Sequence, residues 1–226
     1  MIVAEQKDFK EIFDSVKEFD NILVLGCGTC VTVCMAGGEK EVGILAKQLK
    51  LAADKDDLNL NIKENTITRQ CDKEFFDETT AKKIREADVV LSLGCGVGVQ
   101  YLVEVFPEAV VRPGVNTKFF GANVQQGIWA ERCAGCGECV LDRFEGICPV
   151  ARCSKSLMNG PCGGSSNGMC EVDPENVECA WQLIYDRLKK MDKLENLMEN
   201  QPPKDWSTNR DGGPRKIVRE DVLFDE

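Results

Sequence analysis

The sequence predicts an α/β protein in two parts: a small doubly wound domain with a parallel sheet, then an irregular region rich in cysteine. Three observations lead to this prediction. Short apolar runs alternate with helical patterns up to residue 122. The thirteen cysteines fall into two groups, one in each part. Between residues 127 and 173, turns rich in glycine and cysteine replace any helical or strand periodicity, which suggests a core built on metal.

The elements of the first part follow in order. Apolar residues at helical spacing between Phe9 and Phe19 predict an opening helix. The runs "NILVL", "NTITRQC", "ADVVLSL" and "AVVRPGV" predict four strands, and the segments between and after them predict helices over 43–53, 75–87 and 99–106. Strands that alternate with helices form parallel sheets with right-handed crossovers. A flavodoxin-like or Rossmann-like strand order of 2-1-3-4 is expected for residues 1–122.

Cysteines follow three of these strands. Cys27 comes after the first strand, Cys71 after the second and Cys95 after the third, while Cys30 begins the next helix. Because ligands of open parallel sheets bind beyond the carboxyl ends of the strands, we expect these four thiols to form one metal site. Cys34 lies one helical turn after Cys30, so it either substitutes as a ligand or is a buried free thiol. The alternative for all five is an ordinary place in the core.

The second part, residues 123–201, contains eight cysteines. The spacing C-x2-C-x2-C of Cys133, Cys136 and Cys139 is typical of a 4Fe-4S cluster, and Gly135 and Gly137 allow backbone amides to approach sulfur. Structural zinc is the competitor, but it usually takes C-x2-C pairs separated by a longer gap. Cys148, followed by proline, resembles the distant ligand of ferredoxins, which serves either the same cluster or another one.

The remaining thiols of this part have wider spacing, and they are Cys153, Cys162, Cys170 and Cys179. Zinc and a further cluster are equal alternatives for them. Two 4Fe-4S clusters are therefore expected, with room for a third, and zinc is the alternative in the region from Cys148 to Cys179. The chain has no histidine, so every predicted metal ligand is a cysteine.

Charge and hydropathy restrict the kinds of partner and the location that are expected for this chain. A net charge of -10 argues against nucleic acid, which needs a basic surface. No apolar run approaches the roughly 18 residues of a membrane span, and the opening "MIVAEQKDFKEIF" does not resemble a secretory signal. A cytoplasmic location is expected. Clustered thiols in a reducing compartment indicate metal binding or redox chemistry, not a disulfide framework.

The chain is predicted to end with a helix and a tail. Asp173 and Pro174 suggest a helix start, and an apolar stripe runs from Trp181 to Met198. Proline then stops the helix at residue 202. The tail, residues 202–226, has an excess of basic residues up to Arg219 and is predicted to extend over a partner protein; a solvated tail is the alternative.

Several motifs resemble a known family. "CAGCGECVLDRFEGICPVARCSKSLMNGPCGG", "CEVDPENVECAWQLIYDRL" and "PPKDW" are similar to the cysteine-rich C-terminal domain of methylenetetrahydrofolate reductases, as in the MetV-type small subunit of acetogenic bacteria. "GCGTCVTVCMAGGEKEVGILAKQL" and "LSLGCGVGVQ" look like the first domain of the same subunit. The resemblance implies iron-sulfur clusters, and zinc in some members. It also implies a separate MetF-type TIM-barrel partner that binds folate and a flavin, FMN or FAD.

The expected function is therefore electron transfer without catalysis of its own. The chain would relay electrons from an external donor to the partner's flavin in one-carbon metabolism of the Wood-Ljungdahl type, and further electron-donating subunits are candidate partners. A (β/α)8 barrel needs about 250 residues, so folate chemistry is expected on the partner. The alternatives are a zinc-stabilised scaffold of the reductase and a redox subunit of a different flavoenzyme or of a heterodisulfide-reductase-type complex.

Overall fold

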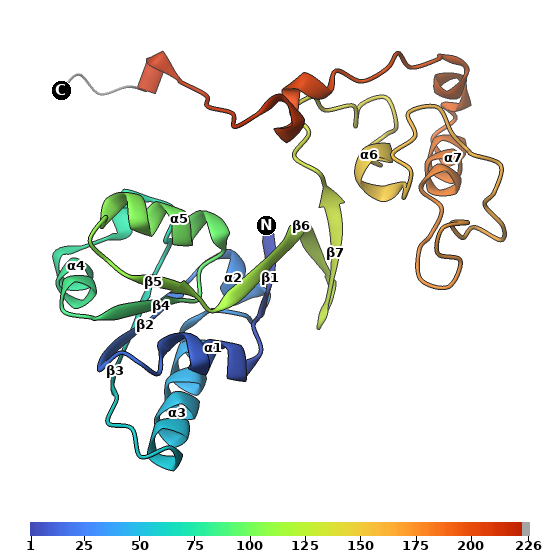
Figure 1. The fold of residues 1–226 in the computed structure, drawn as a ribbon. Coiled ribbons are helices and arrows are strands. Elements are labelled where there is room, and N and C mark those ends of the chain that lie inside the picture. Colours follow the sequence, from blue (N-terminus) through green and yellow to red (C-terminus); the bar gives the residue numbers. More distant parts are fainter. Residues whose placement is uncertain (223–226) are drawn as a thin grey trace. The chain divides into compact units, whose positions relative to one another are not determined.

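The structure is a computed structural model that describes residues 1–222. The chain divides into two compact units, Met1–Ala130 and the part that begins at Glu131 (Figure 1). The first unit contains a four-stranded sheet, most of a three-stranded sheet and most of the helices. The second consists mainly of loops around two helices of 4 and 11 residues. The predicted fold class is confirmed.

The four-stranded sheet is parallel throughout, and its strands lie in the order β3-β2-β4-β5. This is the predicted order 2-1-3-4. The strands are β2 (Asn21–Cys27), β3 (Asn61–Ile67), β4 (Val89–Ser92) and β5 (Val111–Pro113). β3 begins and ends earlier than predicted, because its register with β2 pairs Asn21 with Asn61 and Cys27 with Ile67. The residues up to Cys71 form a turn and not a strand.

Helices cover both faces of this sheet. α1 (Phe9–Val16) and α3 (Glu39–Lys55) pack into one hydrophobic core, and α4 (Glu78–Arg85) and α5 (Gly96–Val105) pack into the other. The helices predicted over 43–53, 75–87 and 99–106 are therefore present with shifted ends. Two shorter elements, α2 (Cys30–Val33) and the 3-10 turn η1 (Lys73–Phe75), connect strands to helices.

The central strand β2 explains the two cores. Ile22 and Val24 face the first core, while Leu23 and Leu25 face the second, and all four are almost completely buried. Alternation along a strand places neighbours on opposite faces, so a continuous apolar run is needed when both faces are covered. Each such side chain stabilises the fold by roughly 1.5–3 kcal/mol.

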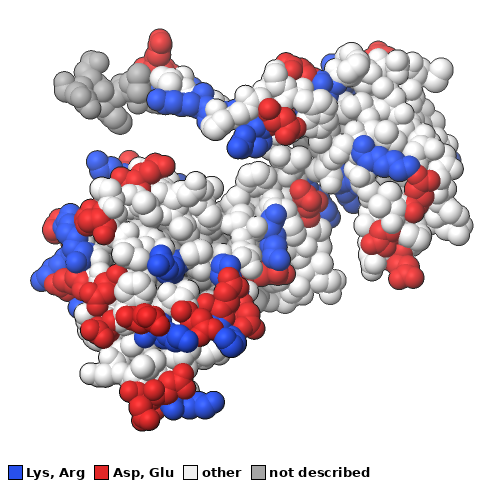
Figure 2. All heavy atoms as spheres, in the orientation of Figure 1, with Lys and Arg blue, Asp and Glu red and all other residues white. Residues whose placement is uncertain are grey.

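Charged side chains contribute less to stability. On the face shown in Figure 2, acidic and basic groups are intermingled over the first unit. They include ion pairs such as Lys63 with Glu86, whose charged groups are 3.1 Å apart and exposed. Exposed pairs of this kind contribute about 1 kcal/mol or less. The stability of the first unit therefore comes from its two apolar cores.

A second sheet was not predicted. Its strands lie in the order β1-β6-β7, and they are β1 (Ile2–Gln6), β6 (Val115–Gln125) and β7 (Ile128–Cys133). β1 is antiparallel to β6. A two-residue turn that contains Gly127, with φ of +83°, joins β6 to β7. The exposed residues of β6 do not alternate cleanly between apolar and polar, so the sequence lacked the usual strand signal.

The second unit has a small core of its own. Helix α7 (Ala180–Lys190) contributes to it, together with the loop around Phe144. A second, shorter helix, α6 (Pro149–Arg152), contacts α7. The rings of Phe144 and Trp181 meet edge to face with centroids 5.4 Å apart. Short 3-10 turns follow, and they are η2 (Leu194–Met198), η3 (Trp206–Thr208), η4 (Arg210–Gly212) and η5 (Glu220–Val222).

The terminal helix is shorter than predicted. Asp173 does accept backbone hydrogen bonds from Glu175 and Asn176, but these bonds close an isolated turn. The helix begins only at Ala180, and it ends at Lys190, before the apolar stripe is complete. Met198, the last residue of the predicted stripe, is 86% exposed. Within residues 1–222, no helix has the length and apolar character needed to cross a membrane.

Candidate cysteine sites

Three cysteines lie at the carboxyl edge of the parallel sheet. Cys27 is the last residue of β2, and Cys95 is the N-cap of α5, just beyond β4. Cys71 lies in the turn that follows β3. Because these strands are parallel neighbours, their carboxyl ends meet at one edge. We call this group, together with Cys30, the edge site.

The three sulfur atoms are close enough to influence one another. Partial burial raises the pKa of the Cys71 thiol, and the negative charges of the Cys95 and Cys27 thiolates raise it further. Like charges nearby disfavour a second ionisation. The Cys71 thiol therefore stays protonated at neutral pH unless a cation binds beside it and reverses the preference.

The two cysteines of α2 have different surroundings. Cys30, the first residue of the helix, is half-buried. Cys34 is buried, and its sulfur accepts a hydrogen bond from the Ala4 amide at 3.4 Å and donates one to the Val31 carbonyl at 3.6 Å. Burial raises the pKa of Cys34. These contacts favour the role of a free thiol in the core for Cys34, and they leave Cys30 as the fourth member of the edge site.

Gln70 is a site residue that the sequence reasoning missed. Its side chain is 1% exposed, and its amide nitrogen donates to the carbonyls of Leu25 at 2.9 Å and Gly26 at 3.1 Å. Its amide oxygen accepts from the Ser92 hydroxyl at 2.6 Å. Gln70 thus joins the ends of β2 and β4, and it precedes Cys71 directly. The only sequence signal was a polar residue beside a cysteine after an apolar strand.

Gly94 leaves the space that Gln70 occupies. A Cβ atom on Gly94 would lie 2.6 Å from the Gln70 amide oxygen, which is closer than a carbon atom can approach. The Gly94 amide also donates to the Ser92 hydroxyl at 3.1 Å. The glycine before Cys95 is therefore explained by close packing against Gln70.

The C-x2-C-x2-C segment forms a loop directly after β7. Cys133 ends that strand, and its sulfur accepts a hydrogen bond from the Gly135 amide at 3.3 Å. Gly135 and Gly137 have φ values of +62° and +86°, a conformation that glycine adopts at little cost. The predicted approach of an amide to sulfur is present at Cys133. We call residues 133–139 the cysteine loop.

Cys148 caps a short helix. It is the N-cap of α6, and its sulfur accepts a hydrogen bond from the Ala151 amide at 3.4 Å. Pro149 occupies the first helical position, where its missing N–H is not needed. The N-cap position thus places the Cys148 sulfur at the start of α6, beside a backbone amide.

The structure brings together the four widely spaced cysteines. A small cavity of about 20 Å³ in the second unit is lined by all of them, that is by Cys153, Cys162, Cys170 and Cys179. Trp181 and Leu157 line it as well. This volume is comparable to the space that one water molecule needs. We call this group the four-cysteine cavity.

Local structure explains how distant residues reach this cavity. The Cys170 amide donates to the Val177 carbonyl at 2.8 Å, and the Cys179 amide donates to the Gly168 carbonyl at 2.8 Å. These bonds fold residues 168–179 back on themselves. The pKa of Cys170 is lowered first by its hydrogen bond with the Ser154 hydroxyl, with the two atoms 3.3 Å apart, and then by a hydrogen bond with the backbone of Val172. At least one thiol of the cavity is therefore inclined towards the thiolate form that metals require.

All thirteen cysteines are free thiols. In the conformations described for residues 1–222, no three acidic or cysteine side chains are close enough to hold one common metal ion. The cysteines of the four-cysteine cavity do line one common space. Their chemistry fits the expectation, because soft thiolate ligands select zinc and iron-sulfur clusters.

The fold and the grouped thiols define a cysteine-rich α/β protein with two units. Residues 112–207 match the family model described as methylene-tetrahydrofolate reductase C terminal. The match begins in β5 and includes the cysteine loop and the four-cysteine cavity. It confirms the resemblance of the motifs in the second unit, whereas the motifs that begin at Gly26 and Leu91 lie outside the matched residues. No curated protein and no solved structure matches the chain.

Proposed function

We propose that the chain is the iron-sulfur electron-transfer subunit of a methylenetetrahydrofolate reductase complex, of the MetV type. It would pass electrons from an external donor to the FMN or FAD of a MetF-type partner. One observation carries the proposal: the cysteine loop, with its two positive-φ glycines, lies inside the part of the chain that matches the reductase family. Bound clusters would supply one-electron transfer at both sites.

Two cluster sites are proposed, one in each unit. The edge site would use Cys27, Cys30, Cys71 and Cys95, which lie where open parallel sheets bind their ligands. The cysteine loop would supply Cys133, Cys136 and Cys139, and Cys148 is the candidate for the fourth ligand. Cys34 would remain a free thiol, because its sulfur already has partners in the core.

The partner is proposed from the family match, which links residues 112–207 to methylenetetrahydrofolate reductases. The sheets of the described residues, one parallel with four strands and one antiparallel, are not a (β/α)8 barrel. We therefore propose that folate binding and flavin chemistry take place on a MetF-type barrel that acts with this chain. The protein part of this chain would position the clusters and adjust their potentials, while the partner carries out the reduction.

Metal analysis under oxygen-free conditions tests the proposal. We expect about eight iron and about eight sulfide per chain, as two 4Fe-4S clusters require, and a paramagnetic signal after reduction with dithionite. The flavin of the co-purified partner should then be reduced by the loaded subunit. A colourless protein without iron, or a loaded protein that never exchanges electrons with the partner, would contradict the proposal.

A second role, zinc-stabilised scaffolding, is favoured by the four-cysteine cavity. Four thiolates around a volume of about 20 Å³ suit a single ion better than a cubane of eight atoms. We propose that zinc binds there and holds the second unit together, whether or not clusters bind elsewhere. We expect one zinc ion per chain, which should stay bound when the iron is removed. If all bound metal were zinc, the scaffold would be the whole function.

A further inference from the structure

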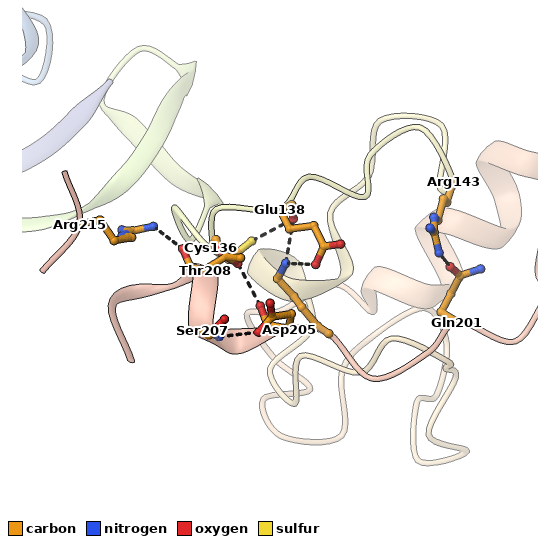
Figure 3. Close-up of polar contacts among 9 residues, drawn as sticks. Cys136, Glu138, Arg143, Gln201, Asp205, Ser207, Thr208 and Arg215 are labelled. Atoms are coloured by element: carbon orange, nitrogen blue, oxygen red, sulfur yellow. Dashed lines mark hydrogen bonds and ion pairs between the residues drawn. The ribbon is translucent and has the colours of Figure 1, made fainter. Parts of the chain in front are cut away.

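The first part of the tail folds back on its own unit. Gln201 is buried, and two hydrogen bonds join it to Asn159. The backbone amide of Gln201 donates to the side-chain oxygen of Asn159 at 2.7 Å. The side-chain amide of Asn159 donates to the backbone carbonyl of Gln201 at 2.8 Å. The side chain of Gln201 also accepts a hydrogen bond from Arg143 (Figure 3). This anchor fixes the point from which the following residues reach the cysteine loop. We call residues 201–215 the strap.

The strap binds the cysteine loop through three side chains, each of which donates to a backbone carbonyl of the loop. Figure 3 shows the contact of Thr208 with Cys136. The pairs are Lys204 with Glu138 at 2.9 Å, Thr208 with Cys136 at 2.9 Å, and Arg215 with Gly135 at 2.8 Å. All three acceptors lie between Cys133 and Cys139. The contacts therefore follow the loop from one end to the other.

Two further observations show that the fit is close. The side chain of Lys204 is 1% exposed, and its ammonium group also pairs with the Glu138 carboxylate at 3.2 Å. A lysine is rarely buried unless its charge is paired. A Cβ atom on Gly137 would lie 2.2 Å from the Thr208 carbonyl oxygen, so the two backbones touch at this glycine. Random contact of a loose tail would not bury a charge or require a glycine.

We propose that Lys204, Thr208 and Arg215 are positioning residues, which fix the peptide planes of the cysteine loop for metal binding. In a trans peptide the carbonyl and the next N–H point in opposite directions. Holding the three carbonyls against the strap therefore turns the amides of Cys136, Gly137 and Cys139 to the opposite side of the loop backbone. From there we expect the amides to donate to cluster sulfur, whereas the Cys136 thiol itself donates to the Glu138 carbonyl at 3.5 Å.

This inference deepens the proposed function and rests on it for its electronic consequence. Amides that donate to cluster sulfur, and positive charges nearby, both stabilise the reduced cluster and raise its potential. The strap supplies the ammonium of Lys204 and the guanidinium of Arg215. Loss of either should lower the potential of the cluster in the loop without removing any ligand.

The first test measures access to Cys136 in the full chain, purified without oxygen and without chelator. Thr208→Val removes the hydroxyl at nearly constant shape, whereas Thr208→Ser keeps it. Loss of one hydrogen bond, worth about 1 kcal/mol, should raise the rate of iodoacetamide labelling at Cys136 about fivefold. Lys204→Met should do the same. Thr208→Ser and the exposed-site control Lys216→Met should match the wild type. Unchanged labelling of Cys170 would show that the unit stays folded.

The second test follows the cluster itself by redox titration with electron paramagnetic resonance. We expect Lys204→Met and Arg215→Met to move one midpoint to lower potential, with Lys216→Met as the control. Wild-type labelling rates together with wild-type midpoints in all strap variants would overturn the inference. If the wild-type protein holds no iron, the proposed function fails, and the labelling of Cys136 alone decides whether the strap orders the loop.

Discussion

A single buried amide organises the edge site. Gln70 contributes no sulfur, but its side chain joins the carbonyls at the end of β2 to the hydroxyl at the end of β4. Buried polar groups of this kind are stabilising only when every partner is present. The residue that follows is Cys71. The position of that thiol between Cys27 and Cys95 therefore depends on a neighbour that does not bind metal.

Replacement of Gln70 by leucine should destabilise the first unit by about 2 kcal/mol, because the Ser92 hydroxyl loses the acceptor of its proton and backbone carbonyls of β2 lose a donor in the core. Urea unfolding monitored by circular dichroism measures this. Gln48→Leu, on the exposed side of α3, is the control and should change stability by about 0.5 kcal/mol or less. Equal effects of the two substitutions would contradict the bridging role of Gln70.

Asp77 gives a prediction for how the stability of the first unit depends on pH. It is the N-cap of α4, and the hydrogen bond from the Thr80 amide holds the pKa of its carboxyl group below the usual 3.8. A lowered folded pKa means that the carboxylate stabilises the fold above about pH 3.8 and that this contribution is lost as the pH falls through the folded value. The difference in urea midpoint between wild type and Asp77→Asn should therefore shrink from pH 7 to pH 3. A constant difference would show that the charge is irrelevant.

At the scale of elements, turns determine the path of the backbone in the second unit more than helices do. Short helices of this length are marginal without packing. The unit relies on several residues with positive φ to reverse the chain, including Gly137 and Gly146. These two glycines differ in their surroundings, since Gly137 touches the strap and Gly146 has nothing within 4 Å of its would-be Cβ atom.

Substitution of each of these two glycines by alanine separates the cost of backbone strain from the loss of the contact between Gly137 and the strap. Gly146→Ala should cost about 1–2 kcal/mol, the penalty for a left-handed residue with a side chain. Gly137→Ala carries the same penalty and also forces the strap away, so trypsin should cleave after Lys204 faster in this variant only. Limited proteolysis followed by mass spectrometry gives the two rates. Equal cleavage in both variants would show that the contact with Thr208 does not hold the strap.

The two units of the molecule differ in how much hydrophobic core stabilises each of them. The first has two apolar cores on the faces of one sheet. The second has a small core around Phe144, Trp181 and Ile184, with cysteine-lined loops around it. Small domains with limited cores usually need metals or disulfides for stability, and all its cysteines are free thiols. Metal is therefore the expected source of the missing stability.

Removal of metal should affect the two units differently. After treatment with a strong chelator, amide hydrogen exchange should lose its protection in α7, whereas β2 and β4 should keep theirs, because their cores do not depend on metal. Untreated protein in the same buffer is the control. Continued protection of α7 in protein shown to be free of iron and zinc would contradict the metal-based core.

The strand order and the helices on both faces could be predicted, because they follow from local apolar runs and from chirality rules that need no knowledge of contacts. β1 and the hairpin β6–β7 could not, because their exposed faces lack alternation and only pairing with each other makes them strands. The predicted start of α7, at Asp173, was also wrong, because a capping side chain alone does not decide whether a helix or a turn follows. Asp173 has the side chain of a helix cap, but its neighbours close a turn instead.

The sequence by itself determined the chemistry of this protein: sulfur as the only soft ligand, cysteines after three parallel strands, and a loop with cluster spacing. The tertiary structure decided which residues meet. It placed Gln70 between two strand ends, gathered four distant cysteines around one cavity, and laid the strap on the cysteine loop. Spacing along a chain fixes only local neighbours, whereas contacts between residues dozens of positions apart depend on how the intervening chain folds.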